Sequence, residues 1–270
     1  MPVYGGRLFK SNVFNCAVPA YIFDPTDIST MYQTDPATTA VASSNDPIGW
    51  YRSKGFAWLP ATQTNASFKP QYQASYINST PAVVGDGSND FLRVTNLPII
   101  PQPLTVIFAA KIGTVVNSAM FFDCGGTSTN RARFNVSSTG FLAMVAGSTV
   151  ASTTAADTNP HVYCLVYNGT SSKMYRDGIL IAAGNAGTQG IEGLTLMASR
   201  TGANCLTGGI GRFVMVGEDL SASPQKMWAI HRWVEAGHAI TDSHTYPEHF
   251  LGIASGVTTI PSSTQYDAWV

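Results

Sequence analysis

The chain has 270 residues, a formal net charge of −1 and only 11% charged residues, against roughly 25% in an average soluble domain. The absence of a basic stripe excludes the electrostatic surface of a typical nucleic-acid-binding protein. Hydrophobic residues make up 44%, enough for the core of one large all-β domain. No apolar run is long enough to cross a bilayer, and residues 1–20 lack the apolar stretch of a signal peptide. We therefore expect a protein made in a cytoplasm, with neither nucleic acid nor membrane as a partner.

The two ends of the chain show no regular hydrophobic period, so we predict an N-terminal arm at 1–19, a domain at 20–240 and a C-terminal arm at 241–270. Disordered tails usually avoid aromatic and branched apolar residues, but both arms contain them. We expect the arms to dock on another subunit, and folding back over their own domain is the alternative. The docking residues that we expect are Tyr4, Phe9, Phe14, Tyr246, Phe250 and Trp269.

Between the arms, short β-branched and aromatic runs alternate with Gly, Pro, Ser or Asn, a pattern typical of an antiparallel sandwich or barrel. Residues 35–70 are instead rich in Thr, Ser, Asn, Ala and Pro and predict a long irregular segment. The strands that we expect are 82–84, 91–94, 104–111, 119–123, 131–136, 141–145, 161–167, 173–177, 193–198 and 210–216.

The strongest local pattern runs from His161 to Ala183, with the sequence HVYCLVYNGTSSKMYRDGILIAA. An apolar run leads through a polar turn at 168–172 into a second run, which carries its own Asp177-Gly178 turn. Alternating apolar positions beside Asn and Gly predict an antiparallel hairpin.

One helix is indicated after Pro224, a residue that fits the first helical position, and it continues to about His238. Met227, Ile230 and Trp233 form a stripe at helical spacing, so we expect the helix to pack across the sandwich. The side chains at 231, 235 and 238 share one helix face. Such a face could bind zinc, but the sequence lacks HExxH, and we interpret these residues as a polar outer face.

Other candidate sites are weaker. Asp86, Asn89 and Asp90 offer oxygen ligands for Ca²⁺, but a Gly-Asp-Gly turn that bonds its own backbone is the interpretation that we favour. The cysteines lie far apart without a CxxC pair and predict buried free thiols; they are Cys16, Cys124, Cys164 and Cys205.

Several stretches in succession resemble concanavalin A-like and laminin-G-like proteins found in bacteriophage virions. They are AYIFDPTDIST, DPIGWYRSKG, TPAVVGDGSNDFLRV, the hairpin at 161–183 and GGIGRFVMVGEDLSASPQKMWAIHRWVEAGHAI. The sequence departs from the pattern at 52–55, where RSKG replaces the usual Asp-x-Ser-Gly. The resemblance implies an all-β, two-sheet antiparallel jelly-roll sandwich with a short C-terminal helix. It also implies a place in a virion, with capsid, portal or tail proteins as partners and a homo-oligomeric state.

No catalytic pattern is present. The paired carboxylates of a β-glucanase strand, the GxSxG nucleophile elbow and the phosphate loop are all absent, and neither Glu218 nor Asp219 has a second carboxylate at an alternate strand position. We therefore expect a protein that is not an enzyme and needs no cofactor.

The function that we predict is a non-enzymatic structural protein of a tailed phage, either a capsid decoration protein or a head or tail fibre component. The alternative is a glycan-binding module that contacts the bacterial surface. Aromatic side chains in long loops stack on sugar rings, although they also pin loops to a core. The residues considered for glycan contact are Trp50, Trp58, Tyr72 and Tyr76.

Overall fold

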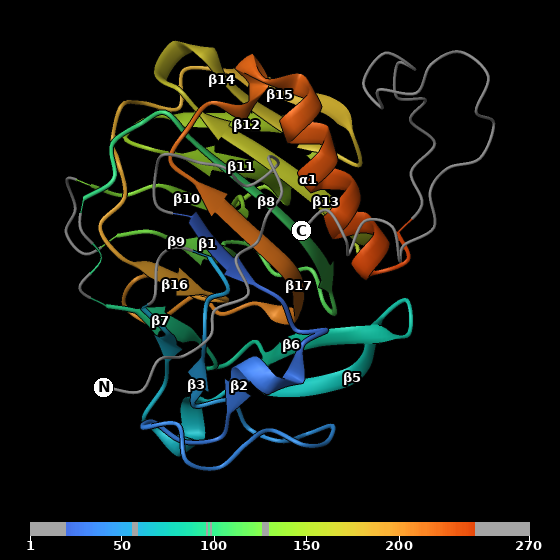
Figure 1. Ribbon diagram of the computed structural model, residues 1–270. Helices are drawn as coiled ribbons and strands as arrows, with labels where there is room; N and C mark the ends of the chain where they lie inside the picture. The colour runs from blue at the N-terminus through green and yellow to red at the C-terminus, as the bar shows by residue number, and fades with distance from the viewer. Residues whose placement is uncertain (1–19, 56–58, 96, 98, 126–129, 241–270) are drawn as a thin grey trace, which may run out of the picture.

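The computed structural model describes residues 20–55, 59–95, 97, 99–125 and 130–240, and these residues form two antiparallel sheets packed face to face (Figure 1). The predicted all-β sandwich with a short C-terminal helix is therefore confirmed. Both predicted arms, with Tyr4, Phe9, Phe14, Tyr246, Phe250 and Trp269, lie outside the described residues. Within those residues, no helix has both the length and the apolar composition needed to span a membrane.

The first sheet, sheet A, has eight strands in the order β15-β14-β13-β8-β17-β6-β5, with β1 also paired to β17. Its strands are β1 (Ala20–Phe23), β5 (Gln71–Ile77), β6 (Thr80–Asp86), β8 (Leu104–Ile112), β13 (Pro160–Tyr167), β14 (Ser172–Arg176), β15 (Ile179–Gly184) and β17 (Thr207–Val216).

The second sheet, sheet B, has nine strands in the order β12-β11-β10-β9-β16-β7-β4-β3-β2. Its strands are β2 (Met31–Tyr32), β3 (Trp50–Tyr51), β4 (Ala61–Thr62), β7 (Leu92–Val94), β9 (Met120–Asp123), β10 (Arg133–Val136), β11 (Phe141–Val145), β12 (Thr149–Ala155) and β16 (Leu194–Leu196). The segment at 35–70, predicted to be irregular, thus supplies the short strands β3 and β4.

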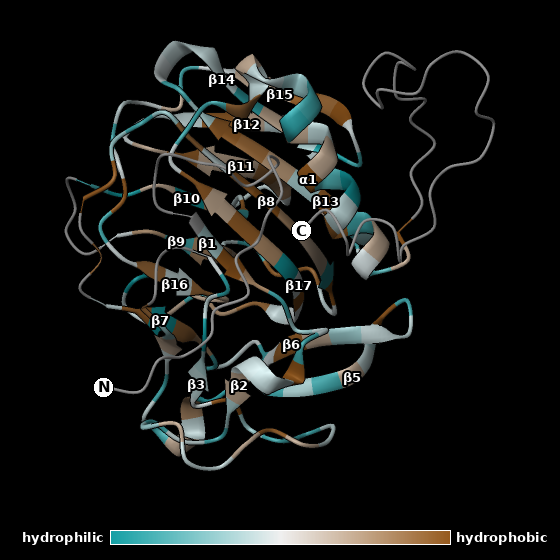
Figure 2. Ribbon diagram, viewed as in Figure 1, coloured by the Kyte–Doolittle hydropathy of each residue, from teal (hydrophilic) through white to brown (hydrophobic). Residues whose placement is uncertain are grey.

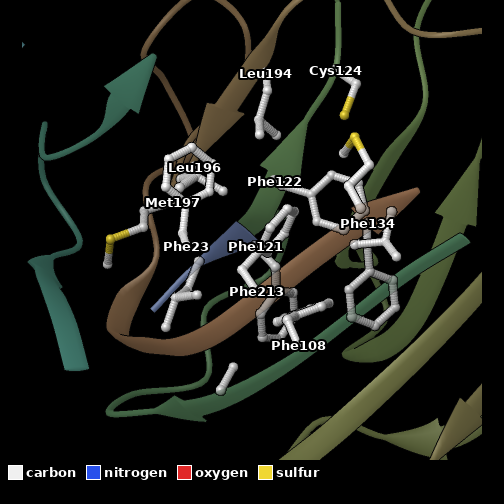
Figure 3. Packing of buried hydrophobic residues seen from close by; sticks show 14 of the residues in the cluster. Phe23, Phe108, Phe121, Phe122, Cys124, Phe134, Leu194, Leu196, Met197 and Phe213 are labelled. Carbon is white, nitrogen blue, oxygen red and sulfur yellow. The ribbon is translucent and has the colours of Figure 1, made fainter. Parts of the chain in front are cut away.

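The core between the sheets is built around phenylalanine rings (Figure 3). The Phe108 ring on β8 lies 5.4–6.0 Å from the rings of Phe121, Phe122, Phe134, Tyr163 and Phe213. The neighbours Phe121 and Phe122 both enter this core because the pairing of β9 with β10 shifts register at this point. Cys124, Cys164 and Cys205 are buried free thiols, as predicted.

Helix α1 (Pro224–Gly237) covers the outer face of sheet A, where β8, β13 and β17 present aliphatic side chains (Figure 1). Figure 2 shows β17 as largely brown, whereas β5 at the sheet edge is mostly teal and white. The predicted stripe of Met227, Ile230 and Trp233 is buried against the sheet. This helix therefore covers the central strands of one of the two outer faces of the sandwich.

The predicted polar outer face of the helix is wrong. His231, Glu235 and His238 are each at most 2% exposed. His231 Nδ1 lies 3.2 Å from Glu235 Oε1, and His238 hydrogen-bonds to strand β17 instead of facing solvent. Because His231 Nδ1 is paired with Glu235 and His238 is hydrogen-bonded to the sheet, the helix can bury these side chains together with its apolar stripe.

The hairpin predicted from 161–183 is formed by β13, β14 and β15, and an ion cluster closes its base. His161 Nδ1 lies 2.5 Å from Asp177 Oδ2, and His161 Nε2 lies 2.9 Å from Asp157 Oδ1. Asp177 also accepts the Val162 N–H at 2.8 Å, and Arg176 Nη1 lies 3.0 Å from Asp157 Oδ2. Burial lowers the pKa of His161, but the two carboxylates outweigh this effect and raise it above its usual value.

We expect His161→Gln to cost more stability at about pH 5 than at about pH 9. A raised folded-state pKa means that charged His161 stabilises the fold below its unfolded pKa of about 6.5, and that this contribution disappears as pH rises through the folded pKa. Urea unfolding of both proteins at the two pH values measures the difference, which we expect to be about 1 kcal/mol. An equal cost at both pH values would contradict the ion cluster.

Candidate functional site

Within the described residues, no helix packs on the outer face of sheet B, in contrast to the outer face of sheet A, which α1 covers in part. The strands of sheet B follow the alternation of a half-buried sheet. On β7, for instance, Leu92 and Val94 enter the core while Arg93 points outward. The same alternation turns Trp50 and Arg133 outward on β3 and β10, because Tyr51 and Phe134 enter the core.

The strand register places outward residues in one continuous line across seven neighbouring strands. The paired positions run in the order Tyr32, Trp50, Thr62, Arg93, Thr195, Asp123 and Arg133, each directly opposite the next. We call these seven residues the polar row. Directly opposed side chains have Cβ atoms about 5 Å apart, so neighbours in the row are within contact distance.

Four arginines gather at one end of the polar row: Arg93, Arg131, Arg133 and Arg200. We call them the arginine cluster. Arg93 donates from Nε to Thr195 Oγ1 at 3.2 Å and from Nη2 to the Arg200 carbonyl at 2.7 Å. A Cβ at Gly125 would lie 2.9 Å from Arg200 Cδ and 3.0 Å from Arg131 Cγ, so these two side chains converge over this glycine.

Asp123 is the anionic centre of this cluster and is fully buried beneath it. Its carboxylate accepts from Arg131 Nε at 2.9 Å, from Arg131 Nη2 at 2.7 Å and from the Arg200 backbone N–H at 2.9 Å. The hydrogen bonds to Asp123 raise the pKa of Arg131. One carboxylate therefore holds the Arg131 side chain and the Arg200 backbone.

Arg133 lies next to Asp123 in the row but forms no ion pair with a described residue. Its Nε is buried without a hydrogen-bond partner, and so is Oδ1 of Asn135, the next outward residue on β10. Burial, followed by repulsion from Arg131, lowers the pKa of Arg133. Buried donors and acceptors are normally paired, so these two atoms mark a place where the protein leaves hydrogen-bonding capacity unused.

The other end of the polar row is aromatic. Trp50 and Tyr32 meet edge to face, with ring centroids 5.3 Å apart, and both side chains are half-buried. Two strand spacings separate Trp50 from Arg93, or about 10 Å at the usual distance between neighbouring strands. Trp50 and Arg93 thus lie within reach of one small oligomeric ligand.

The residues considered for glycan contact do not come together. Trp50 is in the polar row, but Tyr72 and Tyr76 lie on β5 of sheet A, and Trp58 is outside the described residues. Tyr72 is 6% exposed and belongs to the core, and Tyr76 is half-buried under Lys111, whose Nζ lies 5.4 Å from the ring centroid. Neither tyrosine contributes to the face that carries Trp50.

The other sequence candidates have structural roles. Asp86 Oδ1 accepts the Ser88 N–H at 2.7 Å and Asp90 Oδ2 accepts the Asp86 N–H at 3.1 Å, which is the turn that we favoured over a Ca²⁺ site. Burial raises the pKa of Asp90 to about 6. Across the described residues, no group of three or more His, Cys, Asp and Glu side chains is arranged to hold a metal ion.

Glu218 and Asp219 are also tied to local structure. Glu218 pairs with Lys226 of α1. Asp219 accepts the Ser221 N–H and the Asn168 amide, each at 2.8 Å, and so caps the short 3-10 helix at Leu220–Ala222.

Comparison of the sequence with protein-family models and with curated protein sequences gave no match. Among solved structures, the Trypanosoma rangeli sialidase in complex with the inhibitor DANA has a TM-score of 0.48 at 10% identity, over 76% of this chain and 36% of the sialidase chain. Domain 4 of AbnA, a GH43 extracellular arabinanase from Geobacillus stearothermophilus, in complex with arabinotriose, has a TM-score of 0.44 at 13% identity, over 74% of this chain and 91% of that domain.

The CBM40 of the Ruminococcus gnavus IT-sialidase has a TM-score of 0.38 at 16% identity, over 46% of this chain and 80% of the module. The chain thus spans little more than a third of the sialidase chain that it matches. None of these three structures places the chain in a phage particle, so the virion location and the capsid, portal or tail partners stay predictions.

Proposed function

We propose that this chain is a non-catalytic glycan-binding module that presents the outer face of sheet B to its ligand. The observation that carries the proposal is the polar row, in which Trp50 and Tyr32 lie in line with the guanidinium of Arg93, which the buried Thr195 helps to hold. Glycan binding was the alternative function expected from the sequence. Of the four residues considered there for glycan contact, Trp50 is the described one that lies on this face.

The row combines the two kinds of contact that a sugar needs. The C–H groups on one side of a pyranose ring pack on an aromatic ring, and the hydroxyls require fixed donors and acceptors. Arg93 is held by two hydrogen bonds and by the Phe91 ring, whose centroid lies 4.8 Å from the guanidinium carbon. Groups that are already fixed lose little conformational entropy when a ligand binds.

Non-catalytic action is part of the proposal. Asp123, the one carboxylate in the polar row, is fully buried and its hydrogen-bonding capacity is taken up by Arg131 and Arg200. Glycoside hydrolysis generally needs two carboxylates on either side of the scissile bond. The polar row contains no second carboxylate beside Asp123. This favours ligand binding over hydrolysis as the function of the face.

We expect Trp50→Ala to weaken glycan binding at least tenfold, because the substitution removes the aromatic stacking surface. Isothermal titration calorimetry with bacterial-surface oligosaccharides measures the affinity, and circular dichroism checks the fold. Tyr76→Ala is the matched control, since it removes a half-buried aromatic ring from sheet A. Equal losses in both variants, or no binding by the wild-type protein, would refute the proposal.

A further inference from the structure

We propose that the arginine cluster is a subsite for the carboxylate of an acidic sugar, so that the module prefers negatively charged over neutral glycans. This inference rests on the proposed function and names the ligand class of the same face. It starts from the charges: four arginines gather around Asp123, in a chain whose overall formal charge is −1.

The cluster keeps a positive excess after all neighbouring carboxylates are counted. Asp123 is buried within it, and Glu192 borders it, because the Glu192 N–H donates to the carbonyl of Cys124 at 3.0 Å. Even with both carboxylates included, the arginines outnumber the acids by four to two. Burial lowers the pKa of Arg93 and of Arg133, an effect that an incoming anion would oppose.

The hydrogen bonds within the cluster leave donors for a ligand. Asp123 occupies Nε and one Nη of Arg131, and Arg93 uses Nε and Nη2 for Thr195 and the Arg200 carbonyl. Within the described chain, the guanidinium of Arg200 has no hydrogen bond or ion pair, and the guanidinium of Arg133 forms no ion pair. Guanidinium donors in a fixed fork match the two oxygens of a carboxylate.

The position of the cluster determines which part of the ligand it would contact. Arg93 lies about 10 Å from Trp50, two strand spacings along the row. An oligosaccharide with one ring stacked on Trp50 and running along the row would therefore reach Arg93 first, and Arg133, five strand spacings or about 24 Å from Trp50, only with residues further along its chain.

The test compares tetragalacturonic acid with its fully methyl-esterified form, which has the same sugar backbone without the charges. We expect the wild-type protein to bind the acid at least tenfold more tightly, and salt to weaken binding of the acid alone. Arg133→Gln and Arg200→Gln should each lower affinity for the acid about tenfold and leave binding of the ester unchanged. Arg176→Gln on sheet A, with the same loss of charge, should change neither.

The outcomes separate this inference from the proposed function. Equal binding of acid and ester that is lost in Trp50→Ala would retain the glycan-binding module and overturn the acidic subsite. Binding of inorganic sulfate and of dextran sulfate, with no binding of tetragalacturonic acid, would overturn carboxylate recognition. No binding of any glycan by a folded wild-type protein would overturn both.

Discussion

We expect Arg212→Met to lower the free energy of unfolding by about 3–5 kcal/mol, because it leaves the buried Asp24 carboxylate without its main counter-charge. Arg212 on β17 donates from Nε to Asp24 Oδ1 at 3.1 Å, from Nη1 to the Trp233 carbonyl at 2.8 Å and from Nη2 to Thr26 Oγ1 at 3.2 Å. Its guanidinium carbon also lies 4.1 Å from the Trp233 ring centroid. One side chain thus joins the segment after β1 to the central strand and to α1.

Gly237 and His238, at the end of α1, accommodate the Arg212 side chain and backbone. A Cβ at Gly237 would lie 2.5 Å from Arg212 Nε, so the end of α1 can approach because it carries no side chain there. The Arg212 N–H donates to His238 Nε2 at 2.7 Å, which requires a neutral histidine. Burial, together with the Arg212 charge, lowers the pKa of His238 to about 3.

Urea unfolding of the wild-type protein and the variant measures this cost. Arg176→Met is the matched control, because its partner Asp157 is 36% exposed and surface pairs contribute at most about 1 kcal/mol. The double variant Asp24→Asn, Arg212→Met should lose less free energy of unfolding than the two single variants together, because it also removes the unpaired negative charge of Asp24. A cost for Arg212→Met no larger than that of the control would show that the buried pair contributes little.

Several strands that sequence patterns missed lie at the edges of the sheets, and β3 and β4, inside sheet B, were missed as well. We expected most central strands to within a few residues, but β5 and β15 at the edges of sheet A and β12 at an edge of sheet B were not expected. Residues of an edge strand meet solvent on one side of the ladder, so β12 reads TVASTTA, without the apolar content of a core strand. Tertiary pairing, more than local propensity, makes this segment a strand.

The candidate site was missed for a related reason. Local alternation indicates that Arg93 and Arg133 point outward, because each lies beside apolar residues that enter the core. Arg93 and Arg133 come near each other only because β16 lies between β7 and β9. The pairing of β7 with β16 joins segments about a hundred residues apart in the sequence. Trp50 was expected in a loop, but it lies in the strand β3, where the register aligns it with the arginines.

We expect Asp123→Asn to lower the free energy of unfolding by about 3 kcal/mol, the lower end of the cost of breaking a buried ion pair, because the Arg131 side chain remains 25% exposed. The substitution keeps the shape of the side chain but removes the charge that offsets the four arginines. It also turns one acceptor oxygen into an amide that cannot accept from Arg131 or Arg200. The loss should therefore come from repulsion within the cluster as well as from missing hydrogen bonds.

Anions give this variant a signature that a merely structural aspartate would not produce. An anion that binds the cluster replaces the missing charge, so tetragalacturonic acid should raise the melting temperature of Asp123→Asn more than that of the wild-type protein. Asp46→Asn is the control, because Asp46 Oδ2 accepts the Ala42 and Ser43 N–H groups, and the amide oxygen of Asn can still accept them. If tetragalacturonic acid raised the melting temperatures of Asp123→Asn and of the wild-type protein equally, Asp123 would support the fold, but the arginines around it would not bind the ligand carboxylate.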